Sequence, residues 1–195
     1  MSNLSLLQVL CGPDIAQSLA HRPLNEVFGY SMAPPIDVFA SEERLPYPAV
    51  PQVLAAKELL TRAMQTRLEG GIRIDQPDTL KAYLCSKIGH LGYEVFWCLF
   101  LNSQNELISA HELFRGTLTQ TSVYPREVVV MAMRANASAV IFCHNHPAGP
   151  TIPSRADELL TQTLKQTLAL VDVRVLDHII VSGTSALSMA QHGLV

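Results

Sequence analysis

The sequence predicts an α/β fold for residues 76–195, preceded by a small helical region over residues 1–75. In the second part, amphipathic helical stretches alternate with short runs rich in β-branched and aromatic residues, in the order α-β-β-α-β-α-β-β. The clearest element of the first part is a helix. A chain of 195 residues is long enough for one hydrophobic core, or for one core with a small appendage.

Helical periodicity dominates the first part of the chain. Apolar residues recur every three or four positions from Gln52 to Leu68, which predicts a helix that ends at the Gly70-Gly71 pair. A short helix is also expected after Pro13. The boundary between the two parts is expected at residues 70–77.

The first half of the α/β part begins with an expected helix over residues 77–91, with Asp78 as its N-cap. Residues 93–116 hold two apolar runs around the turn sequence NSQN, which predicts a β-hairpin. A second helix is expected over residues 125–137, with Pro125 in its first turn.

The second half of the α/β part begins with AVIFCHNH, residues 139–146. This run is continuously apolar up to its histidines, which is typical of a central strand buried on both faces. Residues 154–172 place their leucines on one face and predict a helix. Residues 173–183 supply one or two more strands.

The charge balance gives no support to nucleic-acid binding. Lys and Arg number 14 against 17 Asp and Glu, for a net charge of −3, and neither half of the chain has the basic surplus that favours phosphate contacts. A local basic patch remains compatible with these numbers.

The cysteines and the N-terminus indicate where the protein works. The four cysteines contain no CxxC pair and are expected to be buried, reduced thiols: Cys11, Cys85, Cys98 and Cys143. The N-terminus lacks a basic start followed by a long apolar run, and no stretch reaches 18 apolar residues. We therefore expect a soluble, cytoplasmic protein without a membrane partner.

The stretch CHNHPAGPTIPSRADELL carries the strongest chemical signal. His144 and His146 lie two apart where a strand ends, so both imidazoles point to one side, about 6–7 Å apart along the chain. Neutral imidazole is a common zinc ligand, and Asp157 in the next helix could be a third. Ser154 and Asp157 also form the pattern of a helix-capping box, and the two interpretations can hold together.

A family resemblance adds to these residues. His144-Asn145-His146-Pro147, six further residues, Ser154 and Asp157 match the motif H-x-H-P-x6-S-x-x-D of the JAMM (MPN) metalloproteases. The runs FRGTLTQTSVYPREVV and VIFCHNHPAGPTIPSRADELL and the final HGLV resemble the RadC-like proteins of bacteria. The resemblance implies an MPN/JAMM domain, a cytidine-deaminase-like mixed sheet with flanking helices, over residues 76–195.

The resemblance also implies the roles of single residues. His144, His146 and Asp157 would bind Zn²⁺, and Ser154 would help to hold a developing oxyanion. Glu94 stands where JAMM enzymes carry a glutamate that acts through the zinc-bound water. The implied activity is a metallopeptidase that hydrolyses a peptide or isopeptide bond in an unidentified protein or peptide substrate.

Two assignments stay open at this point. Glu127, in the first turn of an expected helix, is a rival to Glu94 as catalytic base, and its alternative role is to stabilise the helix N-terminus. Asp177 and His178 are expected either to form a hydrogen-bonded structural pair or to support the zinc ligands from behind. Cys143 is expected to face away from His144, in the core.

A second function remains as an alternative: a DNA repair or recombination protein whose zinc site is not proteolytic. RadC-like proteins commonly carry a segment that resembles a helix-hairpin-helix before the JAMM domain. The corresponding residues here, Leu45 to Leu60, lack the glycines that bring backbone N–H groups to phosphates and contain prolines instead. DNA is therefore a possible partner that the sequence does not support.

Overall fold

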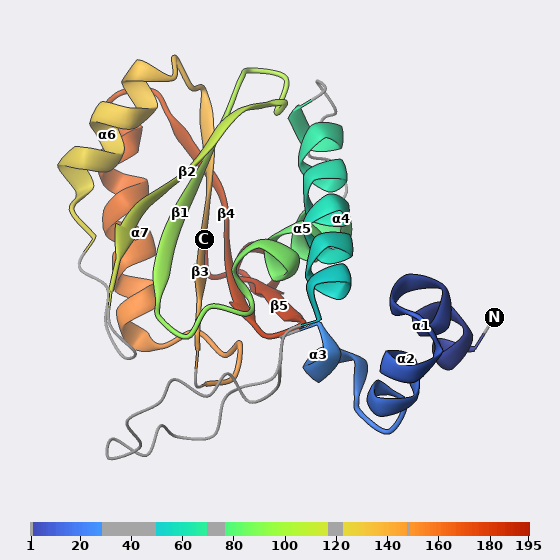
Figure 1. The fold of residues 1–195 in the computed structure, drawn as a ribbon. Coiled ribbons are helices and arrows are strands. Elements are labelled where there is room, and N and C mark those ends of the chain that lie inside the picture. The colour runs from blue at the N-terminus through green and yellow to red at the C-terminus, as the bar shows by residue number, and fades with distance from the viewer. Residues whose placement is uncertain (1, 29–49, 70–76, 117–122, 148) are drawn as a thin grey trace.

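The computed structural model describes residues 2–28, 50–69, 77–116, 123–147 and 149–195. Within these residues, a five-stranded sheet lies between layers of helices (Figure 1). The strands are β1 (Val95–Leu101), β2 (Leu107–Arg115), β3 (Ala139–Asn145), β4 (Arg174–Ser182) and β5 (Ser185–Ser188). The helices are α1 (Asn3–Cys11), α2 (Pro13–Leu19), α3 (Leu24–Val27), α4 (Pro51–Glu69), α5 (Pro77–Ile88), α6 (Pro125–Arg134), α7 (Arg155–Ala169) and the 3₁₀ helix η1 (Ala190–His192).

The sheet is mixed, with the strand order β2-β1-β3-β4-β5. Strands β1 and β2 form the expected antiparallel hairpin, and β1 also pairs antiparallel with β3. Strand β3 pairs parallel with β4, a connection that requires a crossover, which α7 supplies. Strand β3 is central and buried along its whole length, which agrees with the continuous apolar run from Ala139 to Cys143 that precedes His144. The predicted α/β class and mixed sheet are confirmed.

Each face of the sheet has its own hydrophobic core. The α5 face buries Leu80, Tyr83, Leu84, Ile88, Leu99, Ile141, Cys143 and Ile179. The α6–α7 face buries Phe96, Phe100, Val128, Val140, Phe142, Leu164 and Leu168. Alternation along β3 therefore sends Cys143 to the α5 face, as expected, and leaves the next position to face α7.

The N-terminal helices form a separate, smaller cluster. Helices α1 and α2 pack against the first turn of α4 and bury Leu7, Cys11, Ala16, Leu19 and Val53. Helix α4 also contacts α5 and β2, whereas α1 and α2 lie away from the sheet (Figure 1). The division at residues 75 and 76 stays a prediction, and Gly70-Gly71 lies outside the described residues.

Several local expectations can be compared with the structure. The helices expected after Pro13, over 52–68, 77–91, 125–137 and 154–172 are present as α2, α4, α5, α6 and α7. Asp78 lies inside the first turn of α5, after Pro77, so the expectation that it caps this helix is wrong; there its charge complements the helix dipole. Strand β5 lies beyond the range expected for the last strands.

Three other expectations concern the cysteines, the hairpin-like segment and membrane-spanning helices. All four cysteines are free and buried, as predicted. The described part of the hairpin-like segment, residues 50–60, enters one continuous helix, α4, while residues 45–49 lie outside the described part. Among the described helices, none combines the length and the apolar character needed to cross a membrane.

Gly89 permits close packing between the end of α5 and the turn after β4. A Cβ atom there would overlap the backbone carbonyl oxygens of Gly183 and Cys85. We predict that Gly89→Ala lowers the free energy of unfolding by about 3 kcal/mol, because the backbone must move to make room. Urea denaturation measures this loss.

Gly92→Ala is the matched control, because a Cβ at Gly92 meets nothing within 4 Å. Its effect should stay within about 0.5 kcal/mol. Equal stability of the two variants would show that the contact between Gly89 and Gly183 does not constrain the fold.

Candidate metal centre

Three side chains converge where β3 ends and α7 begins. Nε2 of His144 lies 2.9 Å from Nε2 of His146 and 3.2 Å from Oδ1 of Asp157. Nε2 of His146 lies 3.6 Å from Oδ2 of Asp157. One potential ligand atom from each residue thus lies within 4.8 Å of the other two. The structure brings together the three residues that the sequence singled out as metal ligands.

The end of β3 and the following loop position the two histidines. His144 is the last residue of β3 to pair with β1, opposite Phe96. The backbone N–H of His146 donates to the carbonyl oxygen of Val181 on β4, at 2.8 Å. The hydroxyl of Ser182 donates to the carbonyl oxygen of Gly149, at 2.7 Å, and ties the loop back to β4.

The start of α7 positions the carboxylate. Ser154 is the N-cap, and its Oγ accepts a hydrogen bond from the backbone N–H of Asp157 at 3.2 Å. Oδ2 of Asp157 accepts in return from the backbone N–H of Ser154 at 2.7 Å and from its hydroxyl at 2.6 Å. The capping box and the approach to the histidines therefore coexist, since Asp157 uses both oxygens.

Hydrogen-bond partners assign the tautomer of His146. Its Nδ1 lies 2.8 Å from the carbonyl oxygen of Pro150. A carbonyl oxygen can only accept, so Nδ1 must carry the proton of the neutral ring. Nε2 of His146 is then left with a lone pair, directed at His144 and Asp157.

A buried chain of hydrogen bonds assigns the tautomer of His144. The Thr161 hydroxyl donates to the carbonyl oxygen of Asp157 at 2.6 Å, so it must accept from Nδ1 of His178, also at 2.6 Å. Nε2 of His178 can then only accept, and it lies 2.8 Å from Nδ1 of His144. Nδ1 of His144 carries the proton, and its Nε2 presents a lone pair.

The electrostatics of His178 agree with this assignment. Burial lowers the pKa of His178 well below its ordinary value, so this ring stays neutral. Burial opposes ionisation of Asp157. When His144 or His146 takes up a second proton, its Nε2 donates to Asp157, and these hydrogen bonds, with the one from Ser154, outweigh burial and hold the pKa of Asp157 well below the ordinary range. A second proton on His146, at Nε2, forms a hydrogen bond with Asp157, which raises the pKa of His146 against burial, and the charge of Glu94 adds to the increase.

The donor set fits a divalent cation. Two imidazole lone pairs and one carboxylate face a single point, so the site presents three acceptors when both imidazole rings are neutral. A cation satisfies all three at once. Two histidines and one carboxylate suit zinc, and three protein ligands leave a fourth position for water or substrate. These residues could therefore hold a metal ion.

Glu94 and Glu127 occupy different surroundings. Glu94 is half-buried, immediately precedes β1, and affects the pKa of His146 through its charge. Glu127 lies in the first turn of α6, half-exposed, with its Oε1 3.3 Å from Nε of the neighbouring Arg126. The surroundings favour Glu94 as the base, and the choice between them stays a prediction.

Sequence reasoning left some of these partners unassigned. The side chains of Asp177 and His178 have different partners. The Asp177 carboxylate accepts from the backbone N–H groups of His178 and Ala190 and from the Ser188 hydroxyl. The His178 ring instead supports His144, the second of the two roles weighed for it. Thr161 was missed, although its position four residues after Asp157 places both on one helix face.

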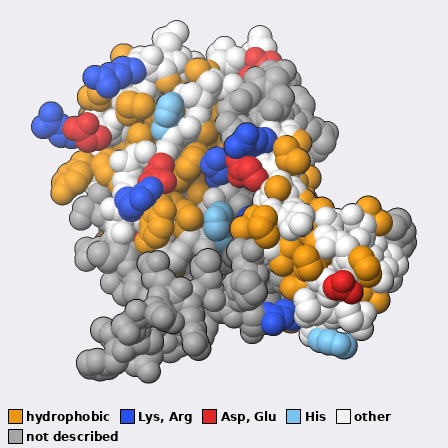
Figure 2. Space-filling model, viewed as in Figure 1, with side chains coloured by type: hydrophobic (Ala, Val, Ile, Leu, Met, Phe, Trp, Pro, Cys, Tyr) orange, Lys and Arg blue, Asp and Glu red, His pale blue; other side chains and the backbone are white. Residues whose placement is uncertain are grey.

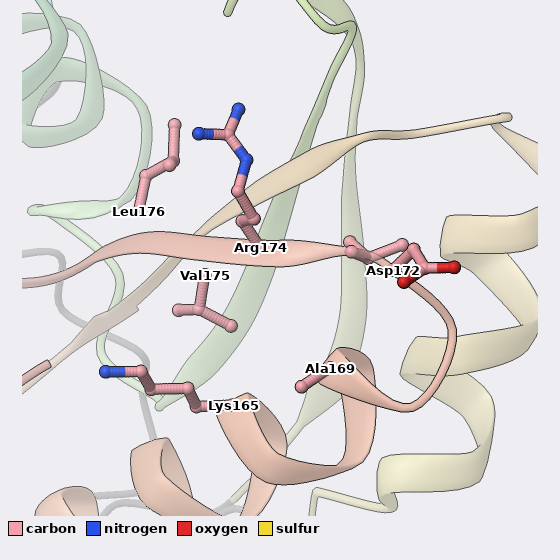
Figure 3. Close-up of a pocket in the computed structure, with 7 residues that line it drawn as sticks. Lys165, Ala169, Asp172, Arg174, Val175 and Leu176 are labelled. Carbon is pink, nitrogen blue, oxygen red and sulfur yellow. The ribbon is translucent and has the colours of Figure 1, made fainter.

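The pocket in Figure 3 does not include His144, His146 or Asp157. It has a volume of about 600 Å³ and is lined by Lys165, Ala169, Asp172, Val173, Arg174, Val175 and Leu176. These residues come from the second half of α7, the turn after it and the beginning of β4, which pairs with the start of β3, whereas His144 lies at the end of β3. Figure 3 shows Lys165 and Arg174 on opposite sides of β4, so their charges do not converge on one ligand.

The described surface shows charges of both signs side by side. On the face in Figure 2, Lys and Arg side chains lie beside Asp and Glu side chains. Ion pairs join Arg62 to Glu58 and Arg115 to Glu112, each at 2.7 Å. Within the described part of this face, the cations do not form a continuous basic surface of the kind that binds nucleic acid.

A mixed sheet with His-x-His at the end of its central strand and an aspartate in the next helix defines a class of α/β domains with a potential metal site. Residues 74–194 match the profile of the RadC-like JAB domain, and the chain belongs to that family. The predicted family is confirmed.

Relatives from several bacteria support the assignment. A UPF0758 protein of Verminephrobacter eiseniae (strain EF01-2) is 57% identical over 143 residues, which are 73% of this chain and 60% of that protein. A UPF0758 protein of Variovorax paradoxus (strain S110) is also 57% identical over 143 residues, 73% of this chain and 64% of that protein. The match thus spans less than two thirds of the length of these relatives.

The role of His178 can be tested through metal affinity. We predict that His178→Ala weakens Zn²⁺ binding about 10- to 100-fold, because His144 loses the acceptor that fixes its tautomer. Competition with a chromophoric chelator measures the dissociation constant. His178→Gln, which restores an acceptor oxygen, should recover part of the loss.

His111→Ala serves as the control, because His111 is exposed on β2 and is not one of the three converging residues. It should bind Zn²⁺ as the wild type does. Unchanged affinity in a folded His178→Ala variant would contradict the proposed support of His144.

Proposed function

We propose that the chain is a zinc-dependent metallopeptidase that hydrolyses a peptide or isopeptide bond. One observation carries the proposal: His144, His146 and Asp157 direct two lone pairs and a carboxylate to one point, with the charge of Glu94 close enough to affect His146. Three protein ligands with an open position are typical of a catalytic zinc, whereas a structural zinc is enclosed by four.

The residues around the site have distinct tasks in this reaction. Bound zinc supplies a Lewis acid that polarises the carbonyl group and lowers the pKa of water to about 7. Glu94 takes a proton from the attacking water and gives it to the leaving amine. The Ser154 hydroxyl donates a hydrogen bond to the oxygen on which negative charge develops. Its proton, which points to Asp157 in the structure, can rotate toward that oxygen.

The neutral tautomers matter for this chemistry. Nδ1 of His144 and Nδ1 of His146 each donate to a fixed acceptor, so both Nε2 atoms remain available as ligands. The low pKa of Asp157 keeps the third ligand ionised. These features support a metal site that binds without prior rearrangement of its side chains.

A peptide or protein fits this chemistry better than a nucleic acid. Zinc, a carboxylate base and a hydroxyl donor are the components of amide hydrolysis. The mixed charges on the described surface and the single continuous helix α4 give the DNA-associated alternative no support. We therefore place the chain among hydrolases of amide bonds.

A mixture of many peptides tests hydrolysis without the choice of a single substrate. The zinc-loaded chain is incubated with a peptide library made by digestion of a bacterial lysate, and mass spectrometry identifies new N-termini and newly freed lysine side chains. We predict cleavage at a recurring sequence pattern. Glu94→Gln should lower the rate of this cleavage at least about 100-fold, because the substitution removes the general base.

Glu127→Gln is the matched control and should cleave at the wild-type rate. Zinc content must be equal in all three proteins, so that a loss of rate reports on the base and not on the metal. Equal rates for wild type and Glu94→Gln, or no cleavage by a fully zinc-loaded wild type, would contradict the proposed function.

A further inference from the structure

Asn145 lies between the two histidines and is almost completely buried, at 1% exposure. Alternation along β3 turns its side chain away from His144 and His146. A buried amide needs partners for its oxygen and for its nitrogen. The partners of Asn145 are all backbone groups of the segment that leads into β1.

The hydrogen bonds of Asn145 hold that segment at three points. Its Oδ1 accepts from the backbone N–H of Val95 at 2.8 Å. Its Nδ2 donates to the carbonyl oxygens of Tyr93, at 3.0 Å, and Leu91, at 3.3 Å. Regular pairing between β1 and β3 ends one residue earlier, at Phe96 and His144, so the Asn145 side chain continues the connection.

Glu94 is the residue enclosed by these bonds. The Asn145 side chain binds the carbonyl group of the residue before Glu94 and the N–H group of the residue after Glu94. The carbonyl oxygen of Glu94 itself accepts from the backbone N–H of Gly116 at 2.8 Å. The backbone of Glu94 is thus fixed from the β3 side and from the end of β2. A fixed backbone fixes the direction in which its side chain leaves the chain.

We propose that Asn145 is a positioning residue that holds Glu94 in place relative to the metal ligands His144 and His146. This inference rests on the proposed function, which gives Glu94 its role. One short segment then supplies both histidine ligands and, through Asn145, the placement of the base. Asparagine suits this task because one side chain combines an acceptor with two donors.

Hydrogen exchange of the full, zinc-loaded chain tests the first part. In Asn145→Ala, we expect the Val95 amide to exchange at least 10-fold faster, measured by NMR, because it loses its acceptor. The dissociation constant for Zn²⁺ should stay within threefold of the wild-type value. Unchanged Val95 exchange, or a loss of zinc affinity beyond 10-fold, would overturn the inference.

Asn102→Ala provides the matched control. Asn102 lies at the opposite end of the β1–β2 hairpin and also accepts backbone hydrogen bonds, from Gln104 at 2.9 Å and Glu106 at 3.0 Å. Its replacement should leave Val95 exchange unchanged. Faster Val95 exchange in this variant would show general loosening of the hairpin and would overturn a specific role for Asn145.

A spectroscopic readout tests whether Asn145 acts through Glu94. The chain is loaded with Co²⁺, whose visible absorption reports on the surroundings of the metal. We expect Glu94→Gln to change the spectrum, Asn145→Ala to change it in the same way, and the double variant to show no further change. A wild-type spectrum for Asn145→Ala, or additive changes, would overturn the inference.

The outcomes separate this inference from the proposed function, because neither readout needs a substrate. Positive exchange and spectral results without any hydrolysis would leave Asn145 as a positioning residue in a protein that is not a peptidase. If Asn145→Ala does not fold, Asn145→Asp replaces it in the spectroscopic test. That variant keeps Oδ1 as the acceptor for Val95 and removes the Nδ2 donor, so a wild-type spectrum would again overturn the inference.

Discussion

The hydrogen bond between Nδ1 of His144 and Nε2 of His178 is the interaction on which the site depends. It places the ring proton of His144 away from Asp157 and leaves a lone pair on Nε2, which could bind a metal ion. The bond has this direction only because Thr161 donates to a carbonyl oxygen and must therefore accept from His178. Phe96 and Phe142 contact the His178 ring edge-on, with centroids 5.6 and 5.8 Å away, so packing also fixes its orientation.

This constraint links the fold to the chemistry. The chain of hydrogen bonds joins β3, β4 and α7, the three elements of the one parallel crossover in the described sheet. The proposed ligands come from the end of β3, the residue just after it and the first turn of α7. The side chains that hydrogen-bond to them from behind come from α7 and β4. A site assembled in this way requires the packed sheet, because no short segment supplies it alone.

The sequence predicted the features that depend on local spacing. Strand alternation placed His144 and His146 on one side, and the capping pattern placed Asp157 in the first turn of α7. The sequence could not decide between the two roles weighed for His178, and it did not predict that Thr161 takes part. The contact between these two residues depends on how β4 and α7 pack together. Asn145 carried no signal, because a polar residue between two histidines at a strand end has no distinctive pattern. Residues 74–194, which match the family, contain all of these side chains.

Metal content tests the central claim most directly. The chain and the double variant His144→Ala/His146→Ala are purified without a histidine tag, incubated with Zn²⁺ and separated from the excess ion. Elemental analysis then measures the zinc content per chain. The account predicts about one zinc per chain in the wild type and its loss in the double variant, because catalytic zinc is held by three such protein ligands. A wild type that retains no metal after this treatment would contradict the metal centre, and with it the proposed hydrolysis.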